Sequence, residues 1–466
     1  MLEKLLAMLV LAAILGQLKR GRELTIMAVS VLAVFLLQPN VQPPNLTFWL
    51  PVLILVITVT AWFLTASPEV RGWRQNWLAG SILVGITLLV DLNRYFELQL
   101  FNTTTPRPQL LLALVIGLAL VFMIVATFRS LGRQWLALLL FVIMLLFVAI
   151  KLPATTEDAL IWLMRPNGNA NEPVILVIRW LGFSYIAFRL IHTIRDCQTG
   201  KLPSVTLSEY VSYVFFFPSL IAGPIDRLEH FVSGLREPLP LGKEDWVFII
   251  QRIFWGFFQK FVLADALAVS ALNDRLALQV TSTPWMWIMV YAYAFQIFFD
   301  FSGYTDIAIG MGRLMGIRLP DNFLAPYLKP NITQFWNNWH ITLTQWFRTY
   351  FFYPLNRSLR QTKFPGWAIL ALTQVSTMVL IGLWHGVTWN YVLWGLWQGL
   401  GLFIHNRWTE WQRIHTDISV LSPFRQTVLT LGGTLFTFHF VALGWIFFAL
   451  STPELSWRVI RRLFGI

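Results

Sequence analysis

Apolar residues follow one another in long runs along most of this chain, and short polar connections separate the runs. The first third holds runs at residues 5–18, 24–37, 47–64, 77–90, 110–128 and 135–150. Further runs lie at residues 174–190, 246–272, 285–301, 367–383, 391–404 and 429–450. A helix needs ~20 apolar residues to cross the hydrocarbon of a bilayer, so the pattern predicts an all-α polytopic membrane protein with about a dozen spanning segments.

Two central regions do not follow this pattern. Residues 208–218 end in Pro218, and the pair Gly223-Pro224 then interrupts an apolar stretch. Residues 334–355 mix aromatic side chains with asparagine, threonine, glutamine, histidine and arginine. Such a segment is too polar to face lipid and too apolar for a solvated loop. We therefore expect re-entrant or interfacial helices that line a cavity inside the bundle.

Composition and charge agree with a membrane protein. Hydrophobic residues make up 56% of the chain and charged residues 12%, with a mean hydropathy of +0.62, whereas a soluble domain carries roughly 25% charged residues. The formal charge is +12, but lysine and arginine are scattered between apolar runs instead of forming a dense stripe. We expect membrane lipids as partners and no nucleic acid. Cys197 is the only cysteine, which excludes an internal disulfide.

Two tryptophan-flanked histidines are the candidates for chemistry. His340 lies in the fragment FWNNWHITLTQWFR (335–348), and His385 lies in LWHG (383–386). Imidazole exchanges protons near neutral pH, and ionisable groups at membrane depth are costly enough to be functional suspects. The alternative is that each is a hydrogen-bonded core residue, as buried polar groups usually are. No second metal ligand accompanies either histidine at a regular spacing, so we expect no metal site.

Asp306 lies in a glycine-flanked segment, FSGYTDIAIG (301–310). We interpret it as a helix-capping carboxylate, with a part in the entrance for a donor substrate as the alternative.

Several fragments occur in an order that resembles the membrane-bound O-acyltransferases, in particular the branch of alginate O-acetyltransferases and teichoic acid D-alanyltransferases. Besides the two histidine fragments they are FSGYTDIAIG (301–310), IRLPDNF (317–323), Pro326-Tyr327 and VTWNYVLWGLWQG (387–399). The resemblance covers residues 179–466, which we predict to form the catalytic core. Residues 1–178 are predicted to be divergent N-terminal transmembrane helices.

The resemblance implies a helix bundle around a tunnel through the membrane, where an acyl group meets a hydroxyl. His385 matches the histidine thought to act as general base, and His340 matches a second histidine that orients a substrate or stabilises charge. Residues expected to shape the substrate site are Trp336, Trp339, Trp384, Asn338 and Asn390.

The same resemblance implies the substrates and partners. The donor is a cytoplasmic thioester, acetyl-CoA or an acyl carrier, with no tightly bound cofactor. The acceptor is a hydroxyl of an exported cell-surface polysaccharide or of a partner protein, and relatives commonly use an extracytoplasmic protein that relays the acyl group. The expected location is a bacterial inner membrane.

A second function class uses the histidines differently. A proton-coupled transporter or polysaccharide exporter would employ them as proton relays. Such proteins commonly have two related halves with interrupted segments at corresponding positions. Here the polar, broken elements lie between Ser208 and His385, and the first half has no counterpart. This asymmetry favours the enzyme.

Overall fold

The computed structural model is helical, and it describes most of the chain. The described residues are 2–18, 20–38, 46–96, 132–151, 182–415 and 422–466, with isolated positions 109, 116–117 and 127. Among them the one strand-like feature is an isolated bridge between Phe323 and Trp339. The prediction of an all-α membrane protein is confirmed.

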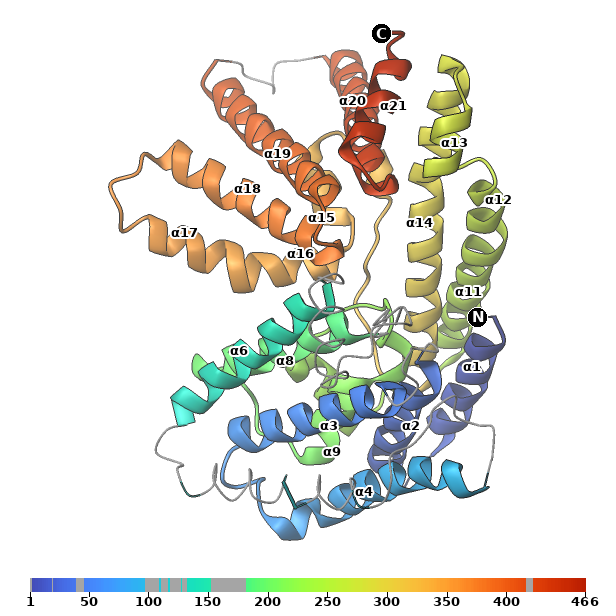
Figure 1. Ribbon diagram of the computed structural model, residues 1–466, viewed down its shortest axis with the longest axis vertical. Helices are drawn as coiled ribbons and strands as arrows, with labels where there is room; N and C mark the ends of the chain where they lie inside the picture. The colour runs from blue at the N-terminus through green and yellow to red at the C-terminus, as the bar shows by residue number, and fades with distance from the viewer. Residues whose placement is uncertain are drawn as a thin grey trace, which may run out of the picture. The chain divides into compact units, whose positions relative to one another are not determined.

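The described residues form two compact units, Met1–Ile249 with Ala308–Leu319, and Ile250–Ile307 with Pro320–Ile466. The helices of the first unit are α1 (Leu2–Gln17), α2 (Arg22–Leu37), α3 (Leu46–Thr65), α4 (Trp73–Phe96), α6 (Gly132–Lys151), α8 (Phe183–Gln198), α9 (Leu207–Phe215), the 3-10 turn η2 (Phe217–Ser219) and α10 (Leu228–Arg236) (Figure 1).

Helices α11 (Lys243–Phe258) and α14 (Thr283–Leu314) contribute residues to both units. The second unit also contains the π-turn η3 (Gln259–Ala264), α12 (Asp265–Ala268), α13 (Asp274–Gln279), η4 (Pro326–Leu328), α15 (Ile332–Asn338), α16 (Ile341–Phe347), the π-turn η5 (Arg348–Phe352), α17 (Tyr353–Leu359), α18 (Gly366–His385), α19 (Trp389–His415), α20 (Pro423–Ala449) and α21 (Pro453–Leu463).

Six helical segments among the described residues are long and apolar enough to cross a membrane. They are Thr47–Thr65, Trp73–Leu92, Gln134–Lys151, Lys243–Ala268, Gly366–His385 and Pro423–Ala449. Each coincides with one of the apolar runs in the sequence. Runs 5–18 and 24–37 form the 16-residue helices α1 and α2, which are shorter than the ~20 residues of a full span. Most of run 110–128 and the start of run 174–190 lie outside the described residues.

The broken region before Pro218 folds as short buried elements. Every residue of α9 is buried, and η2 follows after a one-residue gap. Arg189 of α8 is 2% exposed and donates hydrogen bonds to the carbonyl oxygens of Tyr213 (3.0 Å) and Val214 (2.9 Å). The last carbonyls of a helix have no partner within it, so this guanidinium caps the buried end of α9.

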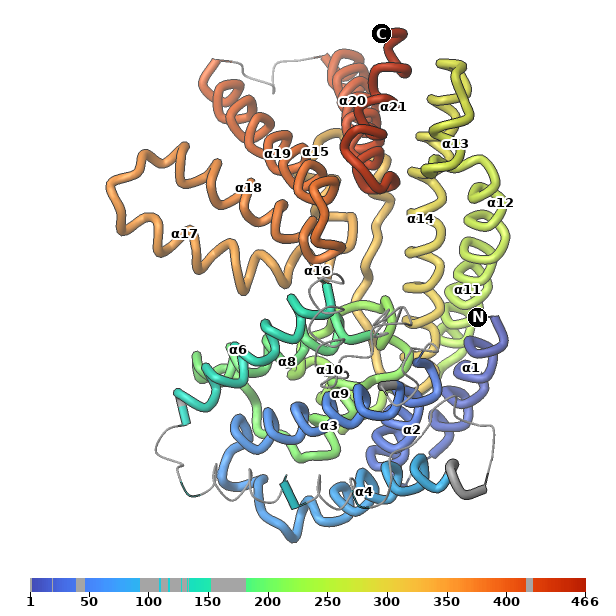
Figure 2. The backbone as a smooth tube through the Cα atoms, in the orientation of Figure 1, coloured from blue at the N-terminus to red at the C-terminus, as the bar shows by residue number. Residues whose placement is uncertain are grey.

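Helices α18 and α19 lie side by side in the second unit, where the orange tubes run together (Figure 2). Two glycines of α19, four residues apart, make this contact. A Cβ added at Gly395 would lie 2.5 Å from Cα of Val379, and one at Gly399 would lie 2.8 Å from Cα of Val375. Small residues at this spacing let membrane helices approach closely. The contact fixes the end of α18, which carries His385.

We expect Gly395→Val to destabilise the protein, because the added side chain must push the α18 backbone away. Overpacking of this kind costs about 1–3 kcal/mol, which should lower the melting temperature of the detergent-purified protein by several degrees. Gly85→Val in α4 is the control, since a Cβ there meets nothing within 4 Å. Equal melting temperatures for the two variants would contradict the proposed role of the glycine contact.

Candidate active site

His340 occupies a sharp break between α15 and α16. Its backbone is left-handed, with φ 43° and ψ 54°, a conformation that costs a residue with a side chain roughly 1–2 kcal/mol. The extended segment 322–324 holds the break in place. Ile341 N–H donates to the carbonyl of Asn322 (3.0 Å), and Leu324 N–H donates to the carbonyl of Asn338 (3.1 Å). Strain held in this way by its surroundings is common at functional sites.

The imidazole of His340 is enclosed, with 2% of the residue exposed. Nδ1 lies 3.2 Å from Oδ1 of Asn322, whereas Nε2 is buried with no hydrogen-bond partner among the described residues. The ring packs edge-on against Phe301 of α14, with centroids 4.6 Å apart. Burial lowers the pKa of His340 to about 3, so the ring is neutral at physiological pH.

His385 is the last residue of α18 and is half-buried. Four aromatic rings surround its imidazole. The centroid distances are 4.3 Å to Trp384, 4.7 Å to Phe448, 5.8 Å to Trp394 and 6.1 Å to Tyr391. These rings come from α18, α19 and α20, so three helices position this histidine.

Both histidines contact the indole of Trp384. Its ring centroid lies 6.2 Å from that of His340 and 4.3 Å from that of His385. The structure therefore brings together two residues that are 45 positions apart in the sequence (385 − 340). Each reaches the same aromatic side chain from a different helix end.

The other predicted tryptophans belong to an aromatic cluster made of Trp336, Trp339, Trp384, Trp394, Trp445 and Phe448. Trp336 and Trp339 are each 4% exposed. Trp336 packs edge-on against Trp394 at 5.8 Å, and Trp339 lies 5.1 Å from Trp445. His385 contacts Trp384, Trp394 and Phe448 of this cluster, and His340 contacts Trp384.

The two predicted asparagines form hydrogen bonds with neighbouring backbone and hydroxyl groups. Asn390 is 1% exposed and donates to the carbonyl of Leu450 (2.6 Å) and to the hydroxyl of Ser456 (3.1 Å), which ties α19 to the segment after α20. Asn338 donates to the carbonyl of Gln334 (2.8 Å) within α15. Among the described side chains, neither of these amide bonds reaches an imidazole.

Asp306 is not a helix cap, so that interpretation is wrong. It lies inside α14 and forms an ion pair with Arg252 of α11, which also pairs with Asp321. Arg252 was not predictable as the partner, because 54 residues separate it from Asp306.

Asn322 is a residue that sequence reasoning did not single out. It is 1% exposed and touches both the backbone and the side chain of the His340 break. The only signal was its position in the fragment IRLPDNF, which contributed to the family resemblance without a role of its own.

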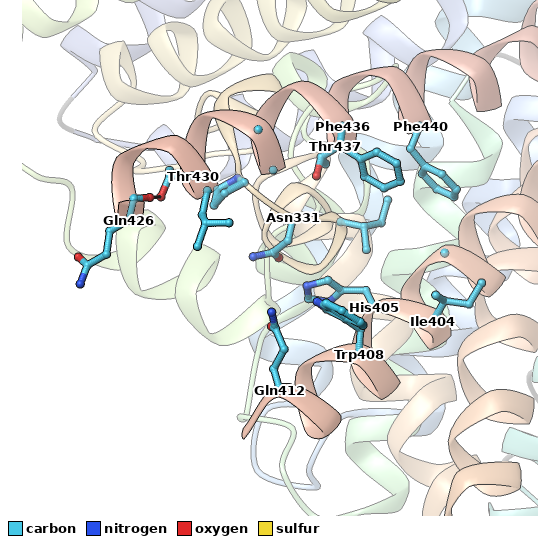
Figure 3. Close-up of a pocket in the computed structure, with 16 residues that line it drawn as sticks. Asn331, Ile404, His405, Trp408, Gln412, Gln426, Thr430, Phe436, Thr437 and Phe440 are labelled. Carbon is cyan, nitrogen blue, oxygen red and sulfur yellow. Dashed lines mark hydrogen bonds between the residues drawn. The ribbon is translucent and has the colours of Figure 1, made fainter. Parts of the chain in front are cut away.

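A cavity of about 870 Å³ lies between α19 and α20 (Figure 3), and neither His340 nor His385 lines it. His405 and Trp408 of α19 face Phe436 and Thr437 of α20 across it. Asn331, the N-cap of α15, forms part of its wall. Seven helical residues then lead to the break at His340, a path of roughly 10 Å at 1.5 Å per residue. Among the described residues no group of three or more histidine, cysteine or acidic side chains could hold a metal ion.

Comparison with known proteins places this site in a family. The sequence profile of the membrane-bound O-acyltransferase family matches residues 134–420, which include both histidines. The chain is 34% identical to a probable alginate O-acetylase of Pseudomonas aeruginosa, over 63% of this chain and 54% of that protein. It is 30% identical to a teichoic acid D-alanyltransferase of Bacillus subtilis, over 62% of this chain and 73% of that protein.

A peptidoglycan O-acetyltransferase of Helicobacter pylori is 32% identical over 55% of this chain and 47% of its own length. The chain thus spans about half the length of the alginate relatives that it matches. The profile match covers more than half of the chain and contains the strained histidine and the end of α18. Of the aromatic cluster it contains Trp336, Trp339, Trp384 and Trp394, whereas Trp445 and Phe448 lie beyond it. The chain belongs to the membrane-bound O-acyltransferase family.

Proposed function

We propose that the protein transfers an acyl group, acetyl in the first instance, to a hydroxyl of an exported cell-surface polysaccharide or of a partner protein. The donor is a cytoplasmic thioester, either acetyl-CoA or an acyl carrier. Names of the relatives support this class of reaction, because they are an alginate O-acetylase, a teichoic acid D-alanyltransferase and a peptidoglycan O-acetyltransferase. An extracytoplasmic protein that relays the acyl group is part of the proposal.

In this proposal residues 179–466 form the catalytic core and residues 1–178 an N-terminal set of membrane helices. The bacterial origin of the relatives supports a location in a bacterial inner membrane. The donor and acceptor meet in a tunnel through the bilayer at the two histidines.

His385 is the proposed general base. The acceptor hydroxyl oxygen attacks the thioester carbonyl carbon while the imidazole takes the hydroxyl proton. The carbon–sulfur bond then breaks, and the departing thiolate takes a proton from the imidazolium. A half-buried histidine at the end of a helix, held by rings from three helices, supports this role because its ring is both positioned and reachable.

The observation that carries the proposal is the meeting of His340 and His385 on Trp384. His340 is proposed to orient the reacting hydroxyl. Trp336, Trp339 and Trp384 are proposed to exclude water, which would otherwise hydrolyse the thioester. Asn338 and Asn390 complete the proposed substrate site, and their hydrogen bonds within and between helices support a positioning role.

The class of reaction is tested by mass spectrometry of cell-envelope and secreted glycans from cells with and without the gene. We expect loss of acetyl groups, or of alanyl groups, from one glycan when the gene is absent. Unchanged modification of all glycans, together with altered export of one of them, would support a transporter instead.

His385→Ala should reduce acyl transfer by at least ~100-fold, because general-base assistance contributes about 10²–10⁴-fold to rate. Glycan acetylation in cells and yield in membranes are the measurements, and yield should be unchanged. His415→Ala is the matched control, because His415 is exposed at the end of α19 and bonds only its own helix among the contacts described. Normal acetylation in the His385→Ala cells would exclude this residue as the base.

His340→Ala should impair turnover severely. His340→Asn tests whether that loss comes from the missing imidazole or from backbone strain at this position. Asparagine tolerates the left-handed conformation better than most residues, so the Asn variant should fold normally and still lose most turnover. Turnover is measured with purified protein and a thioester donor. A His340→Asn enzyme with wild-type turnover would show that the imidazole has no part in the reaction.

A further inference from the structure

The side-chain amide of Asn322 can adopt only one orientation. Its Oδ1 accepts a hydrogen bond from the backbone N–H of Thr342 at 3.1 Å and another from the Thr342 hydroxyl at 3.0 Å. A backbone N–H can only donate, so the atom facing it must be the amide oxygen. The flipped amide would place two donors against each other. The orientation is kept even though Nδ2 of Asn322 has no hydrogen-bond partner among the described residues.

This orientation in turn fixes the proton on His340. Nδ1 of the imidazole lies 3.2 Å from the same Oδ1, at the long end of the range for an N–H···O bond. Because Oδ1 can only accept, Nδ1 must carry the hydrogen. A neutral imidazole has one N–H, so Nε2 is left with a lone pair. That atom is buried and has no hydrogen-bond partner in the part of the chain that the structure describes.

The surroundings keep the ring neutral. The rings packed against it are those of Phe301, Phe323 and Trp384, none of which titrates in the physiological range. On α14, which carries Phe301, the titratable groups nearby are Tyr304, Asp300, which pairs with Lys260, and Asp306, which pairs with Arg252. Asp321 also pairs with Arg252, and His385 lies beyond Trp384. Burial is the largest cause of the lowered pKa of His340.

We infer that Asn322 is a positioning residue that holds His340 in its Nδ1–H tautomer, so that the Nε2 lone pair accepts the hydrogen of an incoming hydroxyl. The catalytic consequence of this inference rests on the proposed acyl transfer, whereas the assignment of the tautomer does not. The inference also excludes one of the two roles expected for His340. A neutral ring with an unprotonated Nε2 cannot donate a hydrogen bond from that atom to a developing oxyanion, so stabilising negative charge there is excluded.

The test of the chemical role is Asn322→Asp. A carboxylate still accepts from Thr342 and from Nδ1–H of His340, so the fold and the tautomer are kept. Its negative charge favours the imidazolium and raises the pKa of His340. Below that raised pKa the ring is protonated and the Nε2 lone pair is lost. We therefore expect activity that approaches wild type at high pH and falls more than tenfold below wild type at low pH.

Two further variants distinguish a positioning role of Asn322 from a purely structural one. Thr342→Val removes the hydroxyl donor but keeps the backbone N–H, so turnover should change less than threefold and the pH profile should not move. Asn322→Leu removes the acceptor altogether, and its turnover should fall at every pH. His385 is unchanged in all of these variants, so only the difference from wild type is assigned to His340.

The tautomer is measured without acyl transfer by solid-state NMR of protein labelled with ¹⁵N-histidine, in which His340→Asn identifies the His340 signals. We expect a protonated Nδ1 and an unprotonated Nε2 in the wild type and in Thr342→Val. A protonated Nε2 in the wild type, or an Asn322→Asp profile that superimposes on the wild type, would overturn the inference. If the tautomer is found and no thioester is consumed, the inference about Asn322 stands and the proposed function fails.

Discussion

The left-handed turn at His340 depends on the hydrogen bonds that residues 322–324 supply to both sides of it. Asn322 and Leu324 pair with Ile341 and Asn338 through the backbone, while the side chain of Asn322 reaches the ring and the start of α16. A conformation that costs roughly 1–2 kcal/mol persists only when its neighbours compensate for it. The segment that compensates here also orients the imidazole. Residues 322–324 therefore determine both the left-handed backbone conformation at His340 and the orientation of its imidazole.

The second histidine depends on a different constraint, the close approach of α18 and α19 at Gly395 and Gly399. The two constraints meet at Trp384, which the packing of α18 places against both imidazoles. Two independently supported elements thus define one site. The indole of Trp384 contacts both imidazoles, which suits the proposed acyl transfer because water at the site would hydrolyse the thioester.

The sequence predicted the elements that depend on composition and local pattern. Within the described part of the chain, runs of apolar residues located the six helices long enough to span a membrane, and Pro218 with the polar stretch 334–355 located the broken ones. Partners that lie far apart in sequence were not predictable. Asp306 pairs with Arg252 across 54 residues, and nothing local distinguishes that carboxylate from a cap. The role of Asn322 was not predictable for the same reason, because it depends on a fold that brings residues 340–342 next to Asn322.

The π-turn η5 directly follows α16 and leads into α17. A π-turn contains one residue more than the α-helical turn that it replaces, and each residue of an α-helix turns the chain by about 100°. The number of residues in the turn 348–352 thus sets which face α17 presents to its neighbours, whatever side chains occupy those positions. Insertions and deletions, more than substitutions, are the changes that would reorient the chain beyond this point.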